Sequence, residues 1–290
     1  MSLLTLLRRR DRILNLTATT ASDGQTVTIQ QLTPTGGSLR VYWGDGATSF
    51  ITNGYTGTIT HVYAAAGVYG IQVMGAQRIT AVDLRDAKLG GLNTAQLRGN
   101  RITYWYVKTI TGSTIRSADM VAWRPSSWCL YSLPAGTYNI ASADMTAWRP
   151  TTWYMFSMPA GTYNISSADM TAWRPSNWVL FSMPAGTYTF AAACMRTWAA
   201  ATEIRCDGLG LSQATVNAIL YDIYAGFADR TGTGGTINVG GSNAAPSGTF
   251  QAAASCPVTD ATPGKEVAWE LLNDTCNVSA KHWTTVTVTA

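Results

Sequence analysis

The sequence of 290 residues predicts a mainly β protein in which a small β-sandwich is followed by a β-solenoid and an α/β C-terminal cap. Three observations predict this fold: short alternating runs after Thr26, a stretch repeated three times at a period of 25 residues, and a helical pattern after Cys206. Repetition at such a period is typical of a solenoid, because one repeat cannot bury its own apolar face. The expected segments are 1–22, 23–76, 77–205 and 206–290.

Residues 1–22 are expected to form a basic N-terminal arm. A short apolar run is followed by Arg8, Arg9, Arg10 and Arg12. A secretory signal has the reverse order, with positive charge before the apolar stretch, so export by the usual signal is not expected. The segment is either a tail, disordered or lying on the surface, or an arm that becomes ordered when its arginines meet acidic groups on a partner. The formal charge of +4 resides largely in this arm, so a nucleic-acid-binding face on the body is not expected.

Residues 23–76 are expected to form the β-sandwich. The runs VTIQQL, LRVYWG, TITHVY and YGIQVMG alternate apolar and polar residues and are separated by turn residues. The segments WGDG at 43–46, HVY at 61–63 and GVYGIQV at 67–73 resemble the polycystic-kidney-disease-type (PKD) domain in order and spacing. The resemblance implies an immunoglobulin-like spacer or adhesion module without catalytic activity. The same residues also have a structural explanation, with Asp45 in a tight turn and His61 packed or bonded to a turn.

Residues 77–205 are expected to form the solenoid. Each repeat is expected to hold one strand, TYNIASADM, followed by a loop with two tryptophans and a turn at Pro-Ala-Gly. The set PAGTYNISSADMTAW resembles the leucine-rich repeats (LRR) of phage and bacterial surface proteins, with Tyr, Ile and Met in the places of leucine. Stacked repeats would align the tryptophans in two columns, Trp123, Trp148 and Trp173 in one and Trp128, Trp153 and Trp178 in the other. A buried core is the expected role of both columns, and a stacking platform for sugar or base is the alternative.

One acidic and one basic position recur with the same period. Stacking would place Asp119, Asp144 and Asp169 in one column, at a cost of about 1 kcal/mol for each pair of neighbouring like charges in water. The same repeats carry Arg124, Arg149 and Arg174, whereas the following repeat has neither charge. We therefore expect a ladder in which the guanidinium groups bridge the carboxylates. The alternative is that the three arginines point outward and bind an anionic glycan or another partner.

Residues 206–290 are expected to cap the solenoid. The pattern predicts an amphipathic helix after an N-cap at Ser212, a second helix at KEVAWELLND, and strands at 235–239 and 283–288. This order resembles the segment that follows leucine-rich repeats in gut-bacterial and phage proteins. The five cysteines form no CxxC pair and have no histidine at ligand spacing, so a zinc site is not expected. A bridge between Cys256 and Cys276 is conceivable, but buried free thiols are the expected state.

The motifs favour a protein without catalytic activity. The two histidines, His61 and His282, do not form a Ser-His-Asp set, and the sequence has no phosphate-binding loop. Neither enzyme activity nor a cofactor nor a metal ion is therefore expected. No apolar run reaches about 18 residues, so a membrane span is not expected either.

The leading hypothesis is a bacteriophage virion protein, either a capsid decoration or a tail component. Its arm would anchor it to other virion proteins in a multi-copy or homo-oligomeric assembly, and its repeats would be displayed outward. The missing signal, the charged share of only 12% and the resemblance to phage proteins motivate this location in the virion. The alternative is an adhesin or glycan-binding protein on the bacterial cell surface, with a host-surface glycan as a candidate ligand. An accessory module of a glycan-active enzyme is a third class.

Overall fold

The computed structural model describes residues 12–190, 193–278 and 281–290. Within these residues the chain is mainly β, and its strands form open sheets, none of which closes into a barrel. The chain divides into two units, one of residues 1–125 and 132–139 and the other of residues 126–131 and 140–290. Of the arginines expected in the arm, Arg8, Arg9 and Arg10 lie outside the described residues.

The first unit begins with two antiparallel sheets. In one, β1 (Ile13–Thr20), β7 (Gly67–Met74), β4 (Leu39–Tyr42) and β5 (Thr48–Ile51) are neighbours in this order, and in the other β2 (Gln25–Ile29) pairs with β6 (Ile59–Tyr63). Alternate residues point inward, because successive side chains of a strand point to opposite faces. The buried inward set includes Leu14, Leu16, Val27, Ile29, Val41, Ile71 and Val73. The strands predicted from the alternating runs are confirmed at β2, β4, β6 and β7.

Residues 13–20 are a strand and not part of an arm. The segment ILNLTATT forms β1, which pairs with β7 over its whole length and buries every second residue. The core of its own chain therefore holds this segment, and no partner is needed to order it. Arg12 also bonds within the chain, because its guanidinium group donates to the carbonyl of Arg98 and to Asn100 Oδ1. The expectation was wrong here because the period-two alternation of apolar residues outweighs the charges that precede it.

Four further pairings in the first unit connect these antiparallel sheets with the first repeats or the first repeats with each other. β3 (Gln31–Pro34) pairs antiparallel with β8 (Ile79–Leu84), which pairs in parallel with β10 (Tyr104–Lys108). β9 (Leu89–Gly90) pairs with β1, and β11 (Thr114–Arg116) pairs in parallel with β13 (Thr137–Ala141). Short 3₁₀ helices, η1 (Ala76–Arg78), η2 (Thr94–Leu97) and η3 (Ser117–Asp119), connect these strands. Strand pairing therefore crosses the expected boundary between residues 76 and 77.

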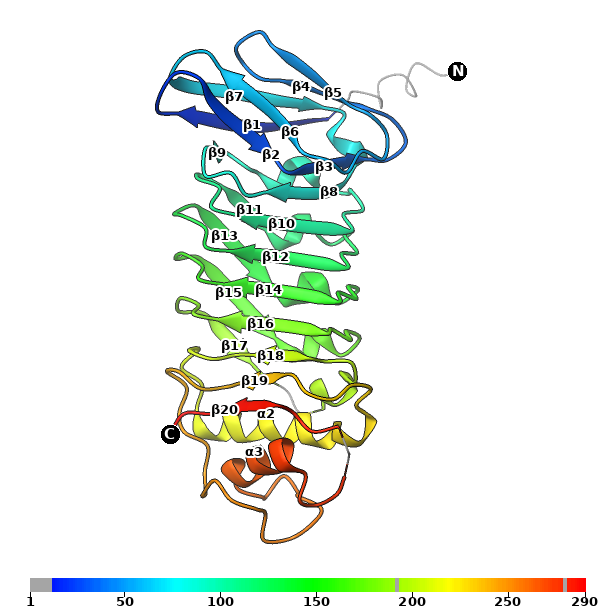
Figure 1. Ribbon diagram of the computed structural model, residues 1–290, viewed down its shortest axis with the longest axis vertical. Coiled ribbons are helices and arrows are strands. Elements are labelled where there is room, and N and C mark those ends of the chain that lie inside the picture. The colour runs from blue at the N-terminus through cyan, green and yellow to red at the C-terminus, as the bar shows by residue number, and fades with distance from the viewer. Residues whose placement is uncertain (1–11, 191–192, 279–280) are drawn as a thin grey trace. The chain divides into compact units, whose positions relative to one another are not determined.

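The second unit is built on one sheet of parallel strands. β12 (Ser127–Tyr131), β14 (Thr152–Phe156), β16 (Asn177–Phe181) and β18 (Glu203–Arg205) follow one another in this sheet (Figure 1). β12, β14 and β16 pair at a constant offset, which places Trp128 opposite Trp153 and Trp153 opposite Trp178. A second parallel pair is made by β15 (Thr162–Ser166) and β17 (Thr187–Thr189). The repeat period of the sequence is therefore the pairing offset of β12, β14 and β16.

Each repeat holds two strands where the sequence predicted one. The segments SWCLY, TWYMF and NWVLF, which were expected in loops, form β12, β14 and β16. In each segment the Trp and the Leu or Met two positions later are buried on the same face. The residues between them point to the other face, and this period of two is that of a strand. The predicted strand TYNIASADM ends after its first half, because the Ser-Ala-Asp segment forms 3₁₀ turns in η3, η4 (Ser142–Met145) and η5 (Ser167–Met170).

The helices and strands expected in the C-terminal cap are confirmed. α2 (Gln213–Ala225) begins after Ser212, whose Oγ accepts a hydrogen bond from the amide of Thr215, and α3 (Gly264–Asn273) packs against it. β19 (Thr236–Asn238) and β20 (Thr285–Thr287) extend the parallel sheet beyond β18, although the 25-residue period has ended (Figure 1). η6 (Met195–Thr197) precedes α2 and η7 (Phe227–Asp229) follows it. The parallel ladder therefore continues into the cap without sequence repetition.

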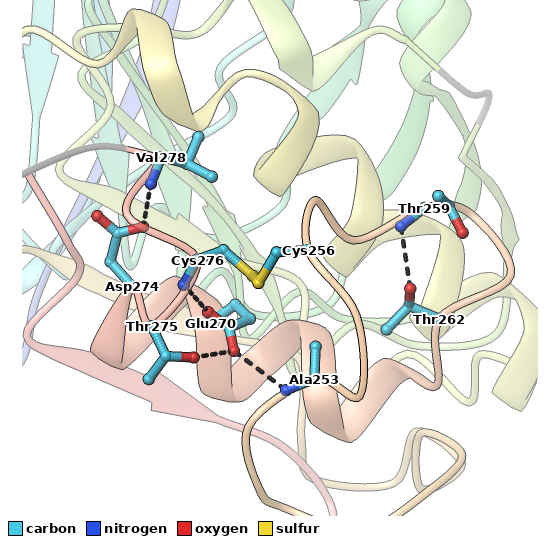
Figure 2. Close-up of a disulfide and its surroundings, with 9 residues drawn as sticks. All are labelled: Ala253, Cys256, Thr259, Thr262, Glu270, Asp274, Thr275, Cys276 and Val278. Carbon is cyan, nitrogen blue, oxygen red and sulfur yellow. Dashed lines mark hydrogen bonds between the residues drawn. A yellow bond between two sulfur atoms is a disulfide. The ribbon is translucent and has the colours of Figure 1, made fainter.

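Cys256 and Cys276 form a disulfide, which corrects the expectation of free thiols for this pair (Figure 2). Beside the bridge, the buried carboxylate of Glu270 accepts hydrogen bonds from the amides of Ala253 and Cys276 and from the hydroxyl of Thr275. The cysteines are 20 residues apart in the chain, and the fold of the cap brings their Cα atoms to 5.4 Å, a distance that a disulfide can span. The other cysteines are buried free thiols, as expected: Cys129, Cys194 and Cys206.

Candidate functional site

Both tryptophan columns are buried. Trp128, Trp153 and Trp178 stack with ring-centroid distances of 5.4 and 5.7 Å, and Trp148 stacks on Trp173 at 6.3 Å. The two columns also pack against each other, for example Trp153 against Trp173. Trp123 is equally buried in the first unit, so all six side chains have 0% exposure. They form the core of the repeats, and no ring face is open for a sugar or base.

A third aromatic column, which was not predicted from the sequence, lies on the other face of the parallel sheet. Tyr131, Phe156 and Phe181 are half-buried and stack at 4.4 and 4.7 Å, and the guanidinium group of Arg205 covers the last ring at 3.9 Å. Because both ring faces of Phe156 and Phe181 are covered, only their edges meet the solvent, which makes the column a poor stacking platform. The signal that could have revealed it is the recurrence of an aromatic residue at the end of SWCLY, TWYMF and NWVLF.

The aspartates are not bridged by the arginines as predicted. Asp119 is buried and accepts hydrogen bonds from Thr94 Oγ1 at 2.9 Å and from Arg98 Nη2 at 2.5 Å. Asp169 accepts a hydrogen bond from Ser142 Oγ at 2.5 Å, and Asp144 is half-buried on η4. The predicted Asp–Arg ladder is therefore wrong. The physical reason is that each aspartate lies in a 3₁₀ turn, where Asp119 and Asp169 bond toward a neighbouring repeat, whereas each arginine comes five residues later and is exposed.

Arg124 in the first unit and Arg149 and Arg174 in the second are exposed and share one geometry, and we call the pair in the second unit, Arg149 and Arg174, the arginine row. In each of the three, Nη1 donates to the carbonyl of the preceding tryptophan, at 2.5, 2.6 and 2.6 Å respectively. The same nitrogen donates to the carbonyl three residues before the arginine, at 3.0, 3.4 and 2.9 Å. These bonds hold each guanidinium group against a turn whose tryptophan belongs to the buried core. The groups are therefore positioned before any partner arrives.

The outward half of each guanidinium group is free. Within the described residues, Nε and Nη2 of these arginines make no hydrogen bond, and no carboxylate pairs with them. In the second unit Arg149 and Arg174 each precede one of two paired strands, β14 and β16. Two residues after the arginines, the amide of Ser176 donates to the carbonyl of Thr151, so the two turns are adjacent. Like charges on adjacent strands about 4.8 Å apart repel by about 1 kcal/mol in water. The arginine row is therefore a cationic surface that no carboxylate among the described residues neutralises.

A cavity of about 400 Å³ lies beside α2 and was not predicted from the sequence. It is lined by alanine and polar side chains of α2 together with Arg196 and Asp260. The carboxylate of Asp222 in its wall accepts hydrogen bonds from the amide of Met195 and from Arg196 Nε. These bonds hold the turn before α2, so the charge of Asp222 is balanced inside the protein. The cavity offers less unpaired charge than the arginine row.

Two further features, a metal-ion site and a membrane-spanning helix, are absent from the described ranges. No group of His, Cys, Asp or Glu side chains there is arranged to hold a metal ion. No helix there has both the length and the apolar character needed to cross a membrane.

Comparison with known proteins gives no match: no family model, no curated protein and no solved structure is similar to this chain. The arginine row is fixed in place by backbone carbonyls and is not neutralised by any described residue, so it is the candidate functional site on geometric grounds alone.

Proposed function

We propose that the protein is a non-catalytic structural and interaction protein of a bacteriophage virion, either a capsid decoration or a tail component. Its repeats form a scaffold that presents the arginine row to an anionic partner. The observation that carries the proposal is the row itself, in which two guanidinium groups are anchored to backbone carbonyls at one end and left without a counter-charge from the described residues at the other. Such groups are suited to recognition, because little side-chain entropy is lost when they bind.

For the fold, we propose an LRR-like β-solenoid over residues 77–205 and a PKD-type, immunoglobulin-like sandwich before it. The constant pairing offset of β12, β14 and β16 supports the solenoid. The sandwich is supported by the contacts among the motif residues. His61 stacks on Trp43 at 4.9 Å and bonds to Asp45 at 2.6 Å, while the hydroxyl of Tyr63 donates to the carbonyl of Trp43. The segments that carry the PKD resemblance thus meet at one place.

The disulfide supports a location outside the reducing cytoplasm. Disulfides persist in oxidising compartments and on virion or cell surfaces, whereas cytosolic thiols are kept reduced. The bridge between Cys256 and Cys276 is therefore consistent with a virion exterior, where the chain would remain after release from the host.

Density-gradient purification of particles from the native source, followed by peptide mass spectrometry and electron cryomicroscopy, tests the proposed location. We expect the protein to co-purify with the particles at a fixed ratio to the major capsid or tail protein. The repeats should be visible as ordered density on the particle. Absence of the protein from purified particles would contradict the proposal.

The second candidate is an adhesin or glycan-binding protein on the bacterial cell surface. The arginine row favours it equally, whereas the tryptophan columns no longer support it because they are buried. Recovery of the protein from the cell-surface fraction of bacteria that release no particles would favour this candidate over the virion.

A further inference from the structure

We propose that the arginine row binds a linear anionic glycan whose carboxylate groups are held by the outward halves of successive guanidinium groups. The inference rests on the proposed function as an interaction protein and names the class of ligand. Its basis is the pair of equivalent arginines in the second unit, Arg149 and Arg174, with the repeat of the fold as the repeat of the binding groups.

The free atoms of the row match a carboxylate. In each arginine Nη1 is occupied by two backbone carbonyls, which leaves Nε–H and one N–H of Nη2 side by side on the other edge. This edge is the fork that binds the two oxygens of a carboxylate through parallel hydrogen bonds. A ligand with one carboxylate per unit would repeat this contact along the row, and each contact would also relieve the repulsion between neighbouring arginines.

The surroundings of the row favour a glycan over a protein partner. In the second unit the exposed residues beside it are small and hydroxylated, namely Thr146, Ala147 and Thr171. The hydroxyls of Thr146 and Thr171 make no hydrogen bond within the described chain and can bond to sugar hydroxyls. The energy of a protein interface comes mostly from a buried cluster of aromatic or other large side chains, and the tryptophans that could supply one lie in the core.

The charge of the row favours a glycan over a nucleic acid. The affinity of nucleic-acid binding comes largely from many phosphate contacts made by lysine and arginine, and single-stranded binding commonly uses exposed aromatic rings on which bases stack. The row offers two cations, and the aromatic columns are either buried or stacked edge-outward. Short single-stranded DNA is therefore the appropriate competing polyanion in the test.

The next repeat shows that the fold does not need these arginines. In the next repeat, Ala199 follows Trp198 where the row has arginine, and Trp198 is still buried and packed against Trp178. Replacement of Arg149 and Arg174 by alanine therefore reproduces a local sequence that the fold already accepts. Loss of binding in such a variant will report on the row and not on unfolding.

The test is isothermal titration calorimetry of the full chain with alginate, a linear polyuronate, and with neutral dextran of similar length. We expect alginate to bind with an affinity that falls as salt is raised, and dextran not to bind. The double variant R149A/R174A should bind at least tenfold more weakly for each arginine removed, as expected for lost charge-assisted hydrogen bonds, and should keep the wild-type melting temperature. Arg116→Ala, which removes an exposed arginine outside the row, should bind as wild type.

The variant R149K/R174K separates the fork from simple charge. Lysine keeps the charge but cannot form two parallel hydrogen bonds, so we expect its affinity to fall between wild type and the alanine variant. The inference is overturned if R149A/R174A binds alginate as well as wild type, if R149K/R174K does so, or if single-stranded DNA binds more tightly than alginate. None of these results depends on whether the protein is found in purified particles, so the ligand and the location fail independently.

Discussion

At the scale of single residues, the recurring Pro-Ala-Gly-Thr-Tyr segment is explained by one hydrogen bond and one close approach. The hydroxyls of Tyr138, Tyr163 and Tyr188 each donate to the carbonyl of the proline four residues earlier, at 2.9, 2.8 and 2.8 Å. A Cβ on Gly136 would lie 2.6 Å from the carbonyl oxygen of Ser113 and 2.7 Å from the Tyr138 hydroxyl. Glycine is therefore required by the space at this turn, and tyrosine closes it.

This bond predicts the behaviour of Tyr138→Phe. Burial raises the pKa of Tyr138 to about 12, above its ordinary value of 10.0, so the neutral form is favoured in the folded state. The stability that this tyrosine contributes is present below about pH 10 and is lost as the pH rises toward 12. We expect the variant to be about 1 kcal/mol less stable than wild type at neutral pH and to lose less stability above pH 10. Urea denaturation across this range measures both effects.

The control for that experiment is Tyr221→Phe. The hydroxyl of Tyr221 makes no hydrogen bond within the described chain, and its ring contact with Arg196 survives the change. Its stability should stay within about 0.5 kcal/mol of wild type. Equal losses in Tyr138→Phe and Tyr221→Phe would contradict the role given to the turn.

A second prediction at this scale concerns acid. Burial by itself raises the pKa of Asp45, but the hydrogen bonds from His61 and from the amide of Ala47, together with the charge of His61, outweigh it and lower the pKa below 3.8. A lowered folded-state pKa means that the contribution is present above about pH 4 and is lost as the pH falls through the folded value. We expect Asp45→Asn to be less stable than wild type at neutral pH, with a difference that shrinks below about pH 4. A difference that is the same at pH 3 and pH 7 would argue against this ion pair.

At the scale of elements, the C-terminal cap depends on its disulfide. The bridge joins the loop after β19 to the segment after α3, and the same region is held by the bonds to Glu270 (Figure 2). Closure of a loop of this size stabilises a fold by about 3 kcal/mol, mainly by restricting the unfolded chain. We expect the double variant C256S/C276S to melt at a lower temperature than wild type, by calorimetry. Reductant should lower the wild-type melting temperature and leave that of the variant unchanged, and an equal response of both would count against the bridge.

The elements also indicate which features a sequence can reveal. Ser212 and the apolar spacing after it predict α2, because capping and helical period are local properties. The buried tryptophan columns follow from the period, because stacked repeats align equivalent residues. The Asp–Arg ladder does not follow, because co-occurrence of Asp144 and Arg149 in a repeat says nothing about the directions of their side chains. The disulfide cannot be derived from the sequence either, since only the tertiary structure brings the two cysteines together.

At the scale of the whole molecule, the repeat is a unit of stability that can be counted. Within the second unit each of β12, β14 and β16 meets an almost identical neighbour, so each step of the ladder makes nearly the same contacts. The stability of such an array is approximately a sum of equal terms for each repeat and each interface between repeats. Removal of one complete repeat should therefore shorten the ladder without changing the contacts that remain.

Deletion of residues 142–166 tests this additivity. The cut joins Ala141, the last residue of β13, to Ser167, the first residue of η5, so the chain continues with the same Ser-Ala-Asp-Met segment. β12 would then pair with β16 and place Trp128 opposite Trp178 in the register that Trp153 now occupies. We expect this variant to fold, with native circular dichroism and a melting temperature a few degrees lower. Deletion of about half a repeat, residues 142–153, should instead prevent folding, because the inward and outward faces of the strands no longer match. Similar behaviour of the two deletions would show that the repeat is not the unit on which the fold is built.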